Sequence, residues 1–130
     1  MRIDIPKVKV DKSATELYNS LSDVRNFEKL MPENIAKFEV LGDDSFVFGL
    51  KGMPEIKLKV REKVPQNRIV LASASDKLSF SLTSDITAVS DNASEVTLSF
   101  EGEFNAMMGM MIKGPITKFM ESLSANMQKL

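Results

Sequence analysis

The chain alternates between apolar and polar residues over most of its length, and the period of this alternation changes near the C-terminus. Between residues 35 and 104 apolar side chains recur at every second position, with turn signals between the runs, which predicts a series of antiparallel strands. From Pro115 the apolar residues recur about every 3.6 positions, which predicts an amphipathic helix over 115–129. The strand residues expected to face the interior are Ala36, Phe38, Val40, Phe46, Phe48, Leu50, Ile56, Leu58, Val60, Leu78, Phe80, Leu82, Val96, Leu98 and Phe100.

The first 31 residues predict one strand followed by two short helices. The strand covers Arg2–Val10, and its apolar positions change phase after Pro6, as a β-bulge would produce. Because proline donates no hydrogen bond to a β-ladder, we expect this strand at the edge of a sheet. Ser13 and Glu16 have the spacing of a capping box, and the helical pattern that follows them is stopped by Pro32.

The composition excludes several kinds of chemistry. The chain contains neither Cys nor His, so it forms no disulfide, no structural zinc site of the usual kind, and no Ser–His or Cys–His nucleophile pair. Its 17 basic and 18 acidic residues give a net charge of −1, which argues against binding to nucleic acid through bulk charge. We predict no metal and no cofactor.

The sequence also indicates where the protein is found. Its N-terminus has no apolar segment of the kind that signal peptides contain. The longest nearly unbroken apolar stretch, from Ala106 to Ile112, is far shorter than the ~20 residues that a membrane-spanning helix needs. We therefore expect a cytoplasmic protein without a transmembrane segment.

Three short motifs near the N-terminus resemble those of a known family. They are Ser13-Ala14-Thr15-Glu16-Leu17-Tyr18, Leu21-Ser22-Asp23 and Leu30-Met31-Pro32. With the order of the predicted elements, they make the chain similar to the START-like superfamily, also called the polyketide cyclase/dehydrase and lipid transport superfamily (SRPBCC). The resemblance implies a single α+β helix-grip domain over residues 1–130. In that fold a curved antiparallel sheet of about seven strands has two short helices after its first strand and a long C-terminal helix packed across it.

The resemblance also implies a function, because members of the superfamily bind sterols, other lipids, quinones and polyketides between the helix and the sheet. We therefore expect binding or transport of a small apolar molecule. Two alternatives stay open: an enzyme of the polyketide cyclase/dehydrase type, and a protein-interaction module with a filled core. The enzyme would have to act through Glu62, Ser84, Tyr18 or Asn105, which form no recognisable pair of base and nucleophile. The interaction module would need an exposed apolar patch.

Most candidate ligand-binding residues are apolar side chains on inward faces. Such side chains line the pockets of apolar ligands, although a small domain normally packs them into a core without large voids. The candidates from the strands and the final helix are Phe38, Phe46, Phe48, Ile56, Leu58, Phe80, Leu82 and Phe119, with Phe100 sharing their phase. Glu62 continues the inward phase of Ile56 and Leu58, where it would orient a ligand hydroxyl or act as an acid unless a register shift turns it outward.

Met107, Met108 and Met111 complete the candidate set. They belong to a methionine-rich stretch just before Gly114-Pro115, which we expect to break or kink the helix because both residues disfavour helix interiors. Residues 106–113 would then form a less stable turn that acts as a gate for the ligand. The alternative is that these flexible side chains fill an irregular gap in the core.

Four cations occupy alternate positions of one predicted strand. They are Lys57, Lys59, Arg61 and Lys63. A row of this kind is typical of a solvated outer face that resists edge pairing. It also permits transient contact with an anionic membrane surface.

Overall fold

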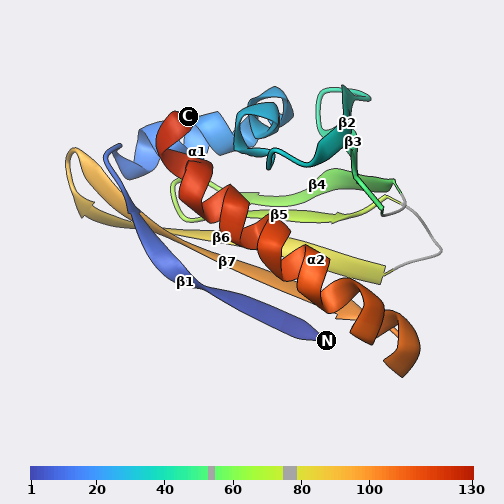
Figure 1. The fold of residues 1–130 in the computed structure, drawn as a ribbon. Helices are drawn as coiled ribbons and strands as arrows, with labels where there is room; N and C mark the ends of the chain where they lie inside the picture. Colours follow the sequence, from blue (N-terminus) through green and yellow to red (C-terminus); the bar gives the residue numbers. More distant parts are fainter. Residues whose placement is uncertain (53–54, 75–78) are drawn as a thin grey trace.

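A computed structural model describes residues 1–52, 55–74 and 79–130. Within them, seven strands form one antiparallel sheet in the order β1-β7-β6-β5-β4-β3-β2, and a long helix, α2, lies across one face of this curved sheet (Figure 1). The elements are β1 (Arg2–Val10), α1 (Ala14–Ser22), the 3-10 helix η1 (Val24–Leu30), β2 (Ile35–Val40), β3 (Ser45–Leu50), β4 (Ile56–Val64), β5 (Arg68–Ser73), β6 (Ser79–Ser90), β7 (Ala93–Glu103), α2 (Ala106–Ala125) and the 3-10 helix η2 (Asn126–Lys129). The predicted α+β helix-grip fold is confirmed.

The N-terminal elements follow the local sequence closely. The register between β1 and β7 shifts between Ile5 and Val8, as the phase change after Pro6 predicts, and β1 is an edge strand. The hydroxyl of Ser13 caps α1 by accepting a hydrogen bond from the amide of Glu16 at 3.1 Å. Because α1 and η1 bury their apolar faces against the sheet, they close one end of its concave side.

The predicted inward face of β2 is partly wrong. A register shift between Ile35 and Lys37 places an extra residue, Ala36, in the strand, where it is exposed. Phe38 keeps the inward phase and packs against the core. Val40 shares that phase, pairing with Phe46, but it lies near the end of an edge strand and stays 37% exposed.

A second bulge changes which residues of β4 face the interior. Val60 pairs with Leu71 in the core, whereas Glu62 pairs with Val70, so the register shifts between the two β4 residues. The extra residue reverses the alternation, and Glu62 lies exposed on the outer face. The prediction of an inward Glu62 is therefore wrong. The prediction that the four cations share one outer face is wrong too, because after the bulge Lys63 pairs with the inward-facing Ile69.

The strands that lie opposite α2 alternate as predicted. On β7, Val96, Leu98 and Phe100 are buried, whereas the intervening residues lie on the other face. Ser84 on β6 shares this inward phase through its pairing with Leu98 and is buried. The predicted inward residue Leu78 lies outside the described residues.

Helix α2 is continuous from Ala106 to Ala125, so the predicted break at Gly114-Pro115 is wrong. Its first turn is capped by Asn105, whose side-chain oxygen accepts from the amide of Met108 at 2.8 Å. Pro115 deprives the carbonyl of Met111 of its usual helical donor, but this turn is exposed, so water can solvate the carbonyl. Among the described helices, none is long and apolar enough to cross a membrane. The cytoplasmic location stays a prediction.

Candidate functional site

A cavity of about 180 Å³ lies between α2 and the concave face of the sheet. Strands β3, β4, β6 and β7 form one wall and α2 forms the other. The described residues that line it are Phe48, Glu55, Ile56, Leu58, Phe80, Leu82, Phe100, Phe104, Met108, Met111, Ile112, Ile116, Phe119 and Met120. Glu55 is the only one of them with a charged or polar side chain.

Strand pairing brings the sheet side of this wall together. Leu82 on β6 lies opposite Phe100 on β7, and Phe48 on β3 lies opposite Ile56 on β4. Because side chains alternate between the faces of a strand, such partners point to the same side of the sheet. The cavity wall is thus built from the period-two pattern of neighbouring strands.

Aromatic stacking shapes both ends of the cavity. At one end the rings of Phe48 and Phe119 are stacked, with centroids 4.5 Å apart. At the other end Phe100 and Phe104 lie almost parallel, with centroids 6.2 Å apart. Gly102 makes room for this second stack, since a Cβ atom there would lie 2.5 Å from the ring of Phe104.

The structure places eight of the twelve candidate residues on the cavity wall. They are Phe48, Ile56, Leu58, Phe80, Leu82, Met108, Met111 and Phe119. Phe46 is buried away from the wall, stacked on Phe27 with centroids 5.2 Å apart, and Phe38 packs beside it at 5.3 Å. Phe46 therefore belongs to a filled part of the core, and Phe38 packs against that part while only partly buried. Glu62 and Met107 are exposed and do not line the cavity.

Several wall residues were not among the sequence candidates. Ile116 and Met120 share the helical stripe of Phe119, and Ile112 extends it by one turn, so the 3.6-residue period could have identified all three. Phe104 continues the phase of Phe100 at the last position of the predicted strand range, one residue after β7 ends. Glu55 has no signal in the sequence, because a charged side chain is not expected on the wall of an apolar cavity.

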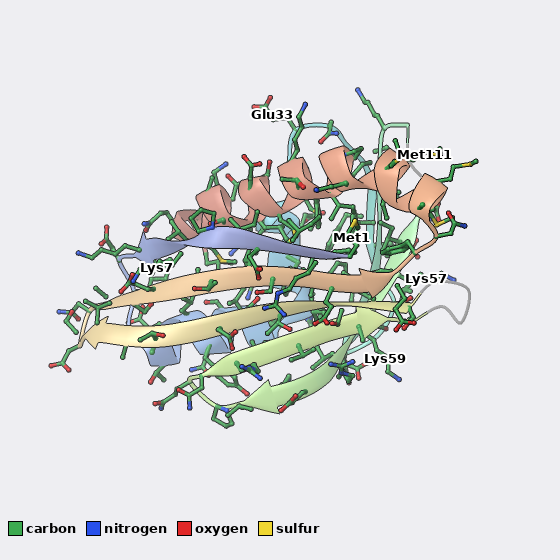
Figure 2. The ribbon with its side chains drawn as sticks, turned by 90° about the horizontal axis from the view of Figure 1, so that it is seen from below. Met1, Lys7, Glu33, Lys57, Lys59 and Met111 are labelled. Atoms are coloured by element: carbon green, nitrogen blue, oxygen red, sulfur yellow. The ribbon has the colours of Figure 1, made fainter. Side chains whose placement is uncertain are left out.

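Helix α2 carries an exposed methionine cluster, defined here as Met107, Met110 and Met111, which are 75%, 83% and 72% exposed. The helix end that carries them extends past the strands in Figure 1, and Figure 2 places Met111 at this free end. Met111 also lines the cavity. The cavity wall therefore continues onto an exposed apolar surface, and the prediction that these side chains fill a core gap is wrong.

The polar side chains considered for a role in the site either have a hydrogen-bonding partner or lie away from the cavity wall. Glu55 accepts a hydrogen bond from the ammonium of Lys37 at 3.1 Å, and this contact raises the pKa of Lys37. Asn105 caps α2, whereas Tyr18 and Ser84 do not reach the cavity wall. Within residues 1–52, 55–74 and 79–130, no group of Asp and Glu side chains is arranged to hold a metal ion.

Comparison with known proteins adds structural relatives. No protein-family model matches the sequence, and no curated protein matches it. Among solved structures, the solution structure of the KanY protein has a TM-score of 0.78 at 14% identity, over 99% of this chain and 95% of that one. A START superfamily protein from Mycobacterium smegmatis has a TM-score of 0.74 at 14% identity, over 98% and 94%. Norcoclaurine synthase from Thalictrum flavum has a TM-score of 0.75 at 14% identity, over 99% and 86%.

These similarities establish the fold. They extend over nearly the whole chain and over most of each relative, so the chain has a START-like fold, as the N-terminal motifs predicted. At 14% identity they do not transfer an activity or a ligand, because one fold supports many functions.

Proposed function

We propose that the protein binds a small apolar molecule, or the apolar part of a larger one, in the cavity between α2 and the sheet, and releases it unchanged. The observation that carries the proposal is the chemistry of the wall, where all the described lining residues except Glu55 are apolar. A polar ligand would lose its hydrogen bonds to water there without replacement, whereas an apolar one gains from leaving water. The wall therefore selects for hydrocarbon surface.

The volume of the cavity limits what it can enclose. An apolar cavity of about 150 Å³ stays dry and accommodates benzene, and the present one has about 180 Å³. It fits one ring or a short acyl segment of a lipid, quinone or polyketide-like molecule. The rest of a larger ligand would extend beyond the cavity.

The arrangement favours binding over the cyclase/dehydrase alternative. General acid–base catalysis needs a titratable group within hydrogen-bonding reach of the reacting atoms. Of the residues considered for such a role, Glu62 is on the outer face of the sheet and Asn105 caps α2, whereas Tyr18 and Ser84 are away from the wall. Glu55 lines the cavity, but its carboxylate is paired with the ammonium of Lys37 at 3.1 Å.

The methionine cluster supports a second role, at the N-terminal end of α2. An apolar ligand is scarce in water, so its exchange is faster at a membrane or another apolar surface. Met107 and Met110 provide exposed, adaptable apolar side chains beside the rim. We propose transient contact of this cluster with a bilayer. Co-flotation with vesicles should fall when Met107 and Met110 are both replaced by Gln, and unchanged flotation would rule the contact out.

Methyl-labelled methionine provides the test of ligand binding. Titration with toluene should shift the NMR methyl signals of Met108, Met111 and Met120, which line the cavity. The methyl signal of Met127, which is buried elsewhere in the core, serves as the internal control. Shifts confined to the three lining methionines would support the proposal. Absence of any saturable shift would overturn it.

A further inference from the structure

Beside the cavity lies a groove of about 520 Å³ between α2 and two loops of the sheet side. One loop joins η1 to β2 and the other follows β3, and the amide of Lys51 donates to the carbonyl of Asn34 at 3.1 Å to hold them together. The groove is lined by Pro32, Asn34, Leu50, Lys51, Gly52, Gly114, Pro115, Lys118, Phe119 and Ser122.

The charge in this groove is positive. Its two charged lining residues are Lys51 and Lys118, and no carboxylate is found among its described lining residues. Both lysines are exposed, and neither forms an ion pair with another described residue. This differs from the cavity rim, where Lys37 is paired with Glu55 at 3.1 Å. Asn34 and Ser122 add hydrogen-bonding side chains to the same groove.

Among the described residues, the groove and the cavity share one wall residue, Phe119. The two spaces also lie against different faces of the same turns of α2. The cavity is lined by Ile112 and Ile116 of α2, and the groove by Gly114 and Pro115 between them. A molecule whose apolar part is in the cavity would have to pass the edge of the Phe119 ring to place its other end in the groove.

Two glycines keep the groove open. A Cβ atom at either Gly52 or Gly114 would meet no atom of the described residues within 4 Å beyond its own chain neighbours. Gly52 also has a positive φ of 82°, which side-chain-bearing residues adopt rarely. Gly114 has no such requirement, and its helical position would be filled more favourably by almost any other non-proline residue.

From these observations we propose that the groove binds the anionic head group of the ligand whose apolar part fills the cavity. The ligand class is then a small amphipathic anion, with one ring or a short acyl chain joined to a carboxylate or a phosphate. Two lysine ammonium groups supply the charge for either anion, and Asn34 and Ser122 supply hydrogen-bond donors. This inference rests on the proposed function of the cavity.

The test compares ligands that differ only in the head group. 3-Phenylpropionate, 3-phenylpropanamide and 2-phenylethyl phosphate are titrated into the protein by calorimetry, with methionine methyl NMR to show that the ring enters the cavity. We expect the carboxylate or the phosphate to bind about 3- to 10-fold more tightly than the amide at low salt. The advantage should shrink in 1 M salt, where the Debye length falls to about 3 Å. The tighter of the two anions identifies the head group.

Matched lysine variants show whether the advantage arises in the groove. Lys51→Gln and Lys118→Gln should each lower the affinity for the anion about 2- to 4-fold and leave that for the amide unchanged. Lys113→Gln is the control, because Lys113 is exposed on the same helix but lines neither space. In addition, Gly114→Asp should remove the preference for the anion, whereas Gly109→Asp, also on an open face of α2, should retain it.

Failure of the anion site and failure of the proposed function give different results in these experiments. If the amide and both anions bind equally and shift the cavity methionines, the anion site is wrong and the proposed function stands. If none of the ligands binds, the proposed function fails. An anion preference that is insensitive to Lys51 and Lys118 would also overturn the inference, because the charge would then be recognised elsewhere.

Discussion

The rings of Phe48 on β3 and Phe119 on α2 lie nearly parallel, with centroids 4.5 Å apart and planes inclined by 7°. This contact joins the helix to the sheet at the point where the cavity and the lysine-containing groove meet, because Phe119 lines both. The same ring therefore has two effects. It anchors the helix through burial, and it separates an apolar space from a polar one.

Phe119→Ala tests both effects. Truncation of a buried phenylalanine costs about 3–5 kcal/mol of unfolding free energy, and we expect a loss in this range in urea denaturation. Phe104→Ala is the comparison, because Phe104 is only half-buried at the other end of the cavity and should cost less than half as much. Where Phe119→Ala still folds, the cavity and groove should merge and admit larger apolar ligands. A cost below 1 kcal/mol would contradict an anchoring role.

Two substitutions on β6 separate the hollow part of the core from the filled part. Leu82 lines the cavity, whereas Ile86, four residues later on the same face, is equally buried but does not line it. Leu82→Phe should place its added volume in free space, change the stability by less than about 1 kcal/mol, and prevent toluene binding. Ile86→Phe should cost about 1–3 kcal/mol through overpacking and leave binding intact in the folded fraction. Equal costs at the two sites would show that the space beside Leu82 is not a usable cavity.

Gly102 explains why β7 can carry a stack of rings at the cavity mouth. A Cβ atom at this position would lie 2.5 Å from the ring of Phe104 and 2.8 Å from the Cβ atom of Phe80. Gly102→Ala should therefore displace Phe104, cost about 1–3 kcal/mol and weaken ligand binding. Adding Phe104→Ala should recover part of the loss, as a double-mutant cycle would measure. Gly109→Ala, where no atom lies within 4 Å, should stabilise the protein instead.

The sequence predicted the strands and helices well because alternation and period report directly on burial. Leu98 and Phe100 on β7 and Leu123 on α2 are buried where their patterns require. The errors at Ala36 and Glu62 arise at register shifts. One extra residue between Val60 and Glu62 reverses the faces of the strand that follows, and no residue type in that stretch signals a bulge.

The candidate site was predictable only in part for a related reason. Alternation identifies inward-facing residues but does not distinguish a hollow region from a filled one. Phe46 and Phe48 share one face of β3, yet Phe46 packs against Phe27 whereas Phe48 borders the cavity. The difference depends on where η1 ends above the sheet, which is a tertiary relationship. The groove lysines were missed for the same reason, because Lys51 and Lys118 are brought together only by the fold.

The N-terminal half of α2 is helical in the structure, but three features make it the weaker half. Pro115 supplies no amide hydrogen for the carbonyl of Met111, and Gly109 and Gly114 both disfavour the helical conformation. From Ala106 to Pro115 no residue is fully buried, whereas Ile116, Phe119, Met120 and Leu123 are buried in the turns that follow. The earlier turns are therefore held mainly by backbone hydrogen bonds, and they carry the cavity-lining residues Met108 and Met111.

We therefore predict that this end of the helix opens locally and admits the ligand. Amide hydrogen exchange should be faster over 106–113 than over 116–123, and bound toluene should slow it. Pro115→Ala restores the missing donor and raises helix propensity by about 3 kcal/mol, so it should slow exchange over 106–113 and lower the rate of ligand association. Gly109→Ala is the control, since it raises propensity by about 1 kcal/mol without adding a hydrogen bond and should have a smaller effect. Equal protection of 106–113 and 116–123 in the unaltered protein, with no response to toluene, would show that the ligand does not enter by this route.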